Sequence, residues 1–373
     1  MSRSGLRDFP NDEWLDFDQP GPGILQQLRR QPPVGVALLA LAAIALAVVI
    51  ETQGKTSTDQ GVNTLAAGPT APFIGFDPSL AYDVARRQVV LVNNPGETWL
   101  WANRTWTRAQ PAISPPAGCC NVAAWDPEIG RVLLFGVEPP GDAAQFTYTY
   151  AWNGATWTAL LRGAVEPPPG AASMAYDPGH RQMVLLVGFG TAAGAVRVQT
   201  WTFEGERWLR RTDLDSPTVS FITALGFDAA AHALLAVSSN VADAGTQTWR
   251  WDGAAWHRLT PSHDPPGSAH MTLVNEPGSG RPLLLTEADA ATSRSAISET
   301  WIWDGRDWVE HGPPGARDVI PYAVSAASDG INGTLWAFQQ FPPDADTVRS
   351  VEALQWSGTG WERAALTRVA RAP

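Results

Sequence analysis

Lysine is nearly absent from this sequence, and its basic residues are outnumbered by acidic ones. Lys55 is the only lysine among 26 basic residues, against 37 acidic residues, so the 373-residue chain carries a formal net charge of −11. Proteins that bind nucleic acid or anionic lipid surfaces need a basic patch. The charge balance therefore argues against both kinds of partner, and we expect no nucleic-acid ligand.

Cysteine is equally scarce, since Cys119 and Cys120 are the only two and they are adjacent. Neither lies near the hydrophobic segment at residues 34–50, which argues against a lipoprotein. In an oxidising compartment two neighbouring thiols either stay as small buried hydrophobic groups or close a vicinal disulfide that would stiffen the loop around them. We favour buried thiols and keep the vicinal disulfide as the alternative.

Signatures of known enzyme classes are missing as well. The sequence contains no nucleophile elbow, no metal-binding histidine pair, no phosphate-binding loop and no dinucleotide-binding fingerprint. A helical hydrophobic period is also absent after residue 51. The sequence therefore assigns no catalytic residue and no cofactor, and it leaves metal binding open.

A single uncharged run, Val34–Ile50, consists of 17 Ala, Val, Leu, Ile and Gly residues. A helix of this length, at about 1.5 Å per residue, is slightly shorter than the hydrocarbon core of roughly 30 Å, and its apolar side chains favour insertion. Arg29 and Arg30 precede the run and Glu51 follows it, so the positive-inside rule places the N-terminus in the cytoplasm. We predict a single-pass plasma-membrane anchor, in preference to a cleaved signal peptide, with an extracytoplasmic remainder.

Composition divides the rest of the chain. Residues 1–33 scatter charges among Pro and Gly without a sustained period, which predicts a disordered cytoplasmic tail. Residues 51–71 are rich in Gly, Thr, Ser and Gln and are predicted to form a flexible linker. Residues 72–373 form one repetitive domain.

A phrase that reads Thr-Trp-x-Trp-Asp-Gly-x-x-Trp at Thr248–Trp256 and Thr300–Trp308 recurs through this domain. Weaker copies begin at Thr98, Thr149, Thr200 and Ala353. The last tryptophans of successive copies stand 48 to 53 residues apart, which is a spacing typical of propeller blades. The six copies predict six repeated structural units.

Each unit resolves into four short strand signals, here named A to D. Strand A ends in an aromatic-Asp pair such as Tyr176-Asp177, strand B is an apolar run such as Met183–Val187, strand C carries Trp-x-Trp, and strand D begins near the last Trp. Asp-Pro pairs mark the turn between strands A and B. Asp-Gly or Asn-Gly pairs mark the turn between strands C and D. The pattern predicts an all-β fold, a six-bladed β-propeller of four-stranded antiparallel blades, preceded by one transmembrane helix.

The unit formed by Met174–Asp177, Val184–Gly188, Thr200–Gly205 and Trp208 resembles bacterial kelch-like repeats of the galactose-oxidase central-domain type. The resemblance covers most of the chain and implies a propeller of six blades. It departs from the kelch pattern at the double glycine after strand B, which is reduced here to Gly136 in the second unit. No motif matches the copper site of galactose oxidase, so the resemblance implies no cofactor.

The tryptophans and the recurring turn aspartates each have a structural and a functional interpretation. Trp249 and Trp251 are two residues apart, so they lie on one face of their strand. We predict that the repeated tryptophans form the core between blades, and an aromatic platform for sugars is the alternative. The Asp after each strand A is predicted to cap its turn rather than to act as a catalytic acid.

In such a meander the A–B and C–D turns share one face, here called the turn face, while the longer B–C loops and the interblade links share the other, here called the loop face. Long, unlike loops on a regular scaffold often carry binding sites, and pairs of acidic residues there could also hold calcium. The residues predicted to bind a ligand at the loop face are Asp213, Asp215, His263, His270, Glu287, Asp289, Tyr322, Asp344 and Asp346.

These observations favour a membrane-anchored extracytoplasmic module that binds a protein or a glycan through the loop face. The alternative is an extracytoplasmic hydrolase or oxidase with its site on the same face.

Overall fold

The computed structural model describes residues 70–74, 79–93, 96–138, 146–164, 167–190, 196–214, 223–240, 245–268, 271–286, 299–311, 323–328, 334–341 and 350–369. These residues belong to one compact unit, residues 65–373. Within these ranges no helix is long and apolar enough to cross a membrane. The predicted tail, the predicted membrane helix and most of the predicted linker lie outside the described residues.

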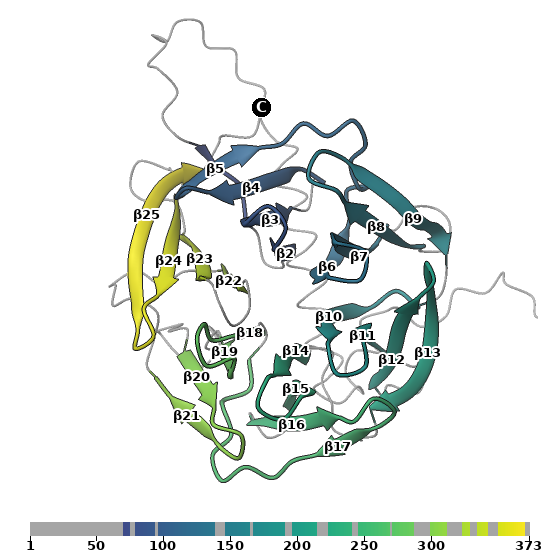
Figure 1. Cartoon of the computed structure of the whole chain (residues 1–373), viewed down its shortest axis with the longest axis vertical. Coiled ribbons are helices and arrows are strands. Elements are labelled where there is room, and N and C mark those ends of the chain that lie inside the picture. The colour runs from purple at the N-terminus through teal and green to yellow at the C-terminus, as the bar shows by residue number, and fades with distance from the viewer. Residues whose placement is uncertain are drawn as a thin grey trace, which may run out of the picture. The chain divides into compact units, whose positions relative to one another are not determined.

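Six sheets, each with one copy of the repeated phrase, surround a common centre (Figure 1). Strand A of every blade lies innermost and strand D lies at the rim (Figure 1). Blades 1 to 3 consist of β2 (Ser79–Asp83), β3 (Gln88–Val92), β4 (Thr98–Ala102) and β5 (Thr105–Arg108); β6 (Cys119–Asp126), β7 (Arg131–Val137), β8 (Thr147–Trp152) and β9 (Trp157–Ala164); and β10 (Ala171–Asp177), β11 (Gln182–Gly190), β12 (Val196–Glu204) and β13 (Arg207–Leu214).

Blades 4 to 6 repeat this order. They consist of β14 (Thr223–Asp228), β15 (Ala233–Asn240), β16 (Gly245–Trp251) and β17 (Trp256–Arg258); β18 (Met271–Asn275), β19 (Pro282–Thr286), β20 (Glu299–Trp303) and β21 (Trp308–Glu310); and β22 (Ala323–Ser328), β23 (Leu335–Phe341), β24 (Ser350–Trp356) and β25 (Trp361–Val369). The prediction of a six-bladed, all-β propeller is confirmed.

An additional strand closes the ring. β1 (Thr70–Ala71) pairs in parallel with β25, where Thr70 lies opposite Arg368 and Ala71 opposite Val369. A strand that precedes blade 1 therefore joins the rim of blade 6. Thr70 and Ala71, the last two residues of the predicted linker segment, thus belong to a strand whose partner lies some 300 residues further along the chain.

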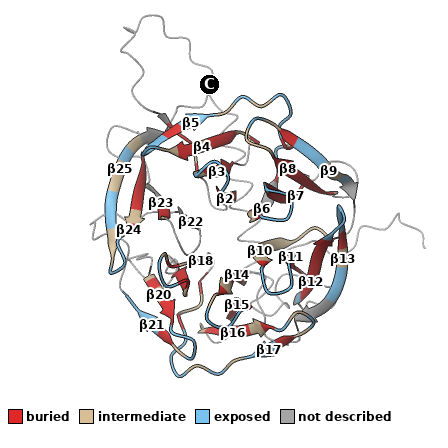
Figure 2. Cartoon of the chain, viewed as in Figure 1, coloured by how far each residue is buried: buried red, intermediate tan, exposed pale blue. Residues whose placement is uncertain are grey.

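The predicted tryptophan core is confirmed. Trp101, Trp152, Trp251 and Trp303 are each no more than 2% exposed. In the same blades this last tryptophan of strand C packs on the tryptophan of strand D, with ring centroids 5.1 to 5.3 Å apart. Buried residues occupy the middle strands of the blades, whereas β9, β13 and β25 at the rim expose much of their surface (Figure 2). The indoles fill the space between neighbouring sheets, which face each other at about 10 Å.

A hydrogen bond across each of five interfaces explains why the phrase begins with Thr and ends with Trp. The indole Nε1 of the strand D tryptophan donates to the hydroxyl of the strand C threonine in the preceding blade. The pairs are Trp157 with Thr98, Trp208 with Thr149, Trp256 with Thr200, Trp308 with Thr248 and Trp361 with Thr300, at 2.8 to 3.0 Å. The two ends of the phrase thus join neighbouring blades.

The interface that closes the ring is built differently. Blade 6 has Ala353 where the other blades have the threonine, so Trp106 of blade 1 lacks that hydroxyl acceptor. Aromatic packing takes its place: Trp106 lies 4.8 Å from Phe338, and Trp101 lies 5.4 Å from both Trp336 and Phe338, measured between ring centroids.

The turn aspartates cap backbone N–H groups, as predicted. Asp126 accepts from the N–H of Glu128 at 2.9 Å, and Asp177 accepts from the N–H of Gly179 at 3.0 Å. At the C–D turns, Gly253 has a φ of +95°. A Cβ on Gly253 would lie only 2.2 Å from the imidazole of His180 in the preceding blade. The positive φ of the turn therefore favours glycine, and a side chain at this position would have to displace the imidazole of His180.

Candidate binding site

Most of the ligand-binding residues predicted from the sequence lie outside the described residues. These are Asp215, His270, Glu287, Asp289, Tyr322, Asp344 and Asp346. Asp213 belongs to β13, where its backbone pairs with Gln199, but its side chain is not described. Cys119 and Cys120 begin β6, and their side chains are likewise not described. Their roles stay predictions.

His263 lies near the turn face, so its predicted place at the loop face is wrong. Its backbone N–H donates to Oδ1 of Asp307 at 2.8 Å, and its Nδ1 lies 2.8 Å from Oδ2 of the same carboxylate. Asp307 belongs to the C–D turn of blade 5. The imidazole is thus held by a neighbouring blade.

The course of the interblade links explains this difference. The link from blade 1 to blade 2 also reaches the next C–D turn: the N–H of Ile113 donates to the hydroxyl of Thr156 at 3.0 Å, and its carbonyl accepts from the N–H of Trp157 at 3.2 Å. These two links therefore do not stay on the loop face. They run along the rim, because these backbone groups find their partners in the next blade.

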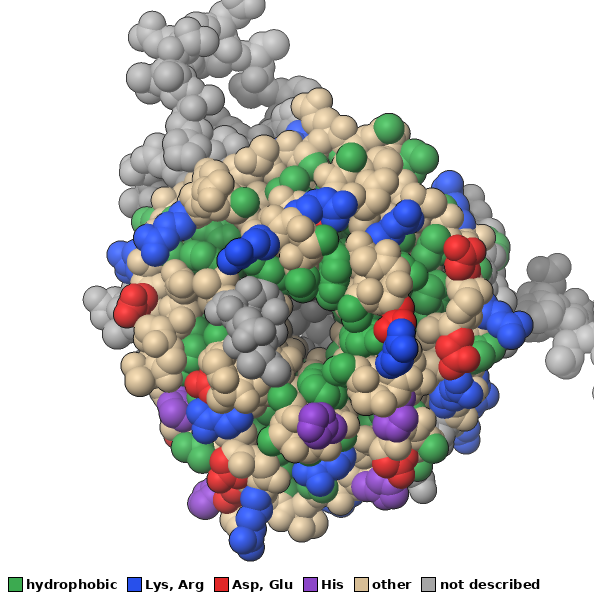
Figure 3. Space-filling model, in the orientation of Figure 1, with side chains coloured by type: hydrophobic (Ala, Val, Ile, Leu, Met, Phe, Trp, Pro, Cys, Tyr) green, Lys and Arg blue, Asp and Glu red, His purple; other side chains and the backbone are tan. Residues whose placement is uncertain are grey.

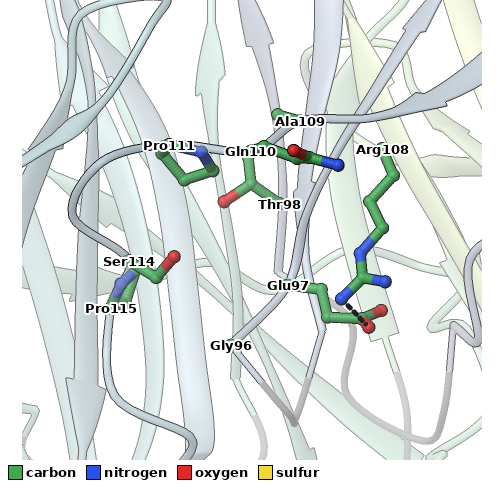
Figure 4. Close-up of a pocket in the computed structure, with 9 residues that line it drawn as sticks. All are labelled: Gly96, Glu97, Thr98, Arg108, Ala109, Gln110, Pro111, Ser114 and Pro115. Atoms are coloured by element: carbon green, nitrogen blue, oxygen red, sulfur yellow. Dashed lines mark ion pairs between the residues drawn. The ribbon is translucent and has the colours of Figure 1, made fainter. Parts of the chain in front are cut away.

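An open cavity of about 360 Å³ lies at the loop-face end of blade 1, between β4, β5 and the link to blade 2 (Figure 4). One wall carries an ion pair, with Nη2 of Arg108 2.6 Å from Oε1 of Glu97. The opposite wall is formed by the link and combines proline rings with polar groups (Figure 4). The lining residues are Gly96, Glu97, Thr98, Arg108, Ala109, Gln110, Pro111, Ser114 and Pro115.

Glu97 is held in place by its neighbours. Its Oε2 accepts from the side-chain amide of Asn93 at 2.9 Å and from the indole Nε1 of Trp99 at 3.0 Å, so Oε1 is left to face Arg108. Burial by itself would raise the pKa of Glu97, but the hydrogen bonds from Trp99 and Asn93 and the charge of Arg108 outweigh burial and lower this pKa. The carboxylate is therefore ionised at neutral pH, and 25% of its side chain stays exposed.

Neither Glu97 nor Arg108 was among the residues predicted from the sequence. The sequence does repeat a Glu or Gln directly before the Thr-Trp of strand C. Gln199 and Glu299 also stand two residues before the first tryptophan of strand C, and each accepts from that indole, at 3.2 and 2.9 Å. Cross-strand pairing places Arg108 opposite Trp99, and Arg210 and Arg258 occupy the same position in blades 3 and 4. This alignment of strands C and D becomes visible only once the register is known.

Outside this cavity, the charged side chains on the visible face of the ring are dispersed (Figure 3). In the face that Figure 3 shows, basic and acidic side chains are scattered over the ring, and the histidine side chains lie in its lower half. In the part of the chain that the structure describes, no group of three or more His, Cys, Asp or Glu side chains is placed to hold a metal ion. The cavity beside Glu97 and Arg108 is therefore the candidate binding site, because its polar side chains are held in place by hydrogen bonds and an ion pair.

The sequence matches no protein-family model and no curated protein. Among solved structures, an Aleuria aurantia lectin in complex with Fucα1-6GlcNAc is similar, with a TM-score of 0.53 and 15% identity over 78% of this chain and 95% of the lectin. The SapL1 lectin in complex with α-methyl fucoside has a TM-score of 0.54 and 12% identity, over 79% of this chain and 96% of that lectin. At these identities the similarity establishes the propeller fold alone.

Proposed function

We propose that the protein is a glycan-binding module and that its ligands are neutral sugars with neighbouring hydroxyl groups. The observation that carries this proposal is the Glu97–Arg108 pair beside an open cavity. A carboxylate accepts hydrogen bonds and a guanidinium donates them. The pair can therefore bind two adjacent sugar hydroxyls, one donating to Glu97 and the other accepting from Arg108.

Two further properties of the cavity support a neutral ligand. Glu97 and Arg108 together carry no net charge, so a charged ligand gains little from them. Pro111 and Pro115 offer apolar ring surface to the C–H groups of a sugar, and Gln110 and Ser114 offer further hydrogen-bonding groups. The similarity of the fold to two lectins whose structures contain fucosides suggests α-methyl fucoside as the first probe.

Binding of α-methyl fucoside to the full-length protein in detergent, measured by isothermal titration calorimetry, tests this proposal. Replacing Arg108 by Gln should weaken binding at this site by about 10- to 100-fold, because a hydrogen bond to a charged group contributes about 1.5 to 3 kcal/mol. The matched control is Arg181→Gln at the turn face, which removes another arginine held 2.6 Å from a glutamate, Glu128. Equal losses in both variants, or no binding of this probe and of other neutral methyl glycosides, would contradict the proposal.

We further propose that the propeller is presented outside the cytoplasm by a membrane anchor at Val34–Ile50. Support comes from the uncharged run and the preceding arginines. The relation to kelch-like repeats of the galactose-oxidase type also stays a prediction from the repeat pattern. Reporters fused to the two ends test the topology: a reporter after Pro373 should be active only outside the cytoplasm, and cytoplasmic activity there would refute the anchor's orientation.

A further inference from the structure

The link after blade 4 is a structural copy of the link after blade 1. Both follow a Trp-x-Arg segment, both have proline three residues after that arginine, and both contain a Pro-Pro pair, at 115–116 and 265–266. The N–H of Ala109 donates to the carbonyl of Thr98 at 2.9 Å, and that of Leu259 donates to the carbonyl of Thr248 at 2.8 Å. The first proline of each pair is buried.

The far ends of the two links are anchored alike as well. Ile113 donates its N–H to Thr156, and His263 donates its N–H to Asp307, each in the C–D turn of the next blade. Arg258 lies opposite Trp249, as Arg108 lies opposite Trp99. The backbone that frames the cavity beside Thr98 is therefore reproduced beside Thr248.

Five of the nine positions that line the first cavity carry a different residue in the second copy, and two of these differences move the carboxylate from one wall to the other. Glu97, which directly precedes β4, is replaced by Gln247, and the link residue Ser114 is replaced by Asp264. Ala109 and Gln110 are replaced by Leu259 and Thr260. Gly96 is replaced by Thr246, whose hydroxyl donates to the carbonyl of Pro265 at 2.9 Å and fixes the link against β16. Arginine stays on strand D in both copies.

Arg258 and Asp264 occupy the positions of Arg108 and Ser114, which lie on opposite walls of the first cavity. Partial burial raises the pKa of Asp264, and the charge of Asp307 acts in the same direction, while the charge of Arg258 acts in the opposite direction. Yet among the described residues no ion pair within 4.0 Å joins Arg258 to an acidic side chain, whereas Arg108 lies 2.6 Å from Glu97. Both Arg258 and Asp264 are exposed. A ligand can bridge them without first separating a direct ion pair.

We propose that Arg258 and Asp264 form a second glycan-binding site, for the same class of neutral sugar with adjacent hydroxyls, at the rim between blades 4 and 5. The inference rests on the proposed function of the first site. In the second site the guanidinium of Arg258 donates to one hydroxyl and the carboxylate of Asp264 accepts from its neighbour. The two sites differ in which wall supplies the acceptor, so they hold the sugar in different orientations.

Calorimetric titration of the full-length protein in detergent with α-methyl fucoside tests the inference. The wild-type protein should bind two molecules per chain, and Arg258→Gln and Arg108→Gln should each leave one. Asp264→Asn should weaken only the second site, by about 10- to 100-fold, the loss expected for a hydrogen bond to a charged group. Arg306→Gln, which changes an exposed arginine of the neighbouring C–D turn, is the control and should leave both sites unchanged.

The outcomes separate the two proposals. One site per chain that is abolished by Arg108→Gln and unaffected by Arg258→Gln would overturn the second site and support the first. One site that is abolished by Arg258→Gln and unaffected by Arg108→Gln would overturn the first site and support the second. No binding of α-methyl fucoside or of other neutral methyl glycosides to the wild-type protein would overturn both. Melting temperatures of all variants within a few degrees of wild type would show that any loss of binding is local.

Discussion

At the scale of single residues, the tryptophans of this protein stabilise the fold in two different ways. The strand D tryptophans use both their rings and their N–H groups, which donate to threonines of the preceding blade. The tryptophans at the end of strand C contribute by packing alone. The Nε1 groups of Trp101, Trp152, Trp251 and Trp303 are buried without a hydrogen-bond partner among the described residues. An unpaired buried donor is costly, so packing must outweigh that cost at these four positions.

The volume of Trp251 can be tested by truncation. Trp251 is fully buried and its ring lies 5.1 Å from that of Trp256. Trp251→Ala should lower the free energy of unfolding by about 3 to 5 kcal/mol, the usual penalty for removing a large buried aromatic side chain. Chemical denaturation measures this change, with the exposed Val309→Ala as control. An unaltered unfolding free energy combined with loss of glycan binding would instead favour the aromatic-platform interpretation.

At the scale of strands and links, neighbouring blades are joined by a repeated hydrogen bond rather than by apolar packing alone. The threonine of strand C and the tryptophan of strand D lie 56 to 61 residues apart in sequence, yet they meet because each blade stacks on the one before it. The links after blades 1 and 4 add a second connection by reaching the next C–D turn. Blade 6, with Ala353 in place of threonine, is the exception.

Substitution of one threonine isolates this bond. Thr200→Val keeps the shape of the side chain but leaves the indole N–H of Trp256 buried without its acceptor. We expect a loss of about 1 to 3 kcal/mol of unfolding free energy, the cost of an unsatisfied buried donor. The exposed Thr158→Val in β9 should change stability by no more than about 0.5 kcal/mol. If both variants unfold like the wild type, the interblade bond contributes nothing measurable.

At the scale of the whole molecule, carboxylates on the turn face couple stability to pH. A hydrogen bond from His257 and two backbone N–H groups hold the pKa of Asp252 well below its usual range. Backbone N–H groups of Asp307 and Arg306 lower the pKa of Asp304, and the backbone N–H of His263 does so for Asp307. These groups favour their charged forms in the folded state, whereas burial raises the pKa of Asp126 and acts in the opposite direction.

The sign of the pH dependence follows from these directions. A carboxyl group with a lowered pKa stabilises the fold at pH values above the unfolded pKa of about 3.9, and this contribution is lost as the pH falls through the folded pKa. Unfolding free energy should therefore decrease below about pH 4. Urea denaturation between pH 7 and pH 3 measures it, and Asp304→Asn should reduce the slope. A stability that rises steadily on acidification would show that groups such as Asp126 dominate.

The sequence by itself determined the repeat and the strands, because the signals for both are local. Tryptophans at alternate positions indicate a strand from a stretch of a few residues, and the dipeptides Asp-Gly and Asp-Pro indicate a turn. The copies of these signals recur at a regular spacing along the chain. The turn-capping role of aspartates such as Asp177 also follows from neighbours along the chain. The six blades and their strand order could therefore be predicted without coordinates.

Only the tertiary structure decided how the ring closes, where the links run and which residues frame the candidate site. Thr70 meets Arg368, Ile113 meets Thr156, and Glu97 meets Arg108 across a strand pair. None of these partners is marked by a local pattern, since each contact depends on the stacking of blades or on strand register. His263 illustrates the point: its sequence position suggested the loop face, but a carboxylate in the next blade holds it near the turn face.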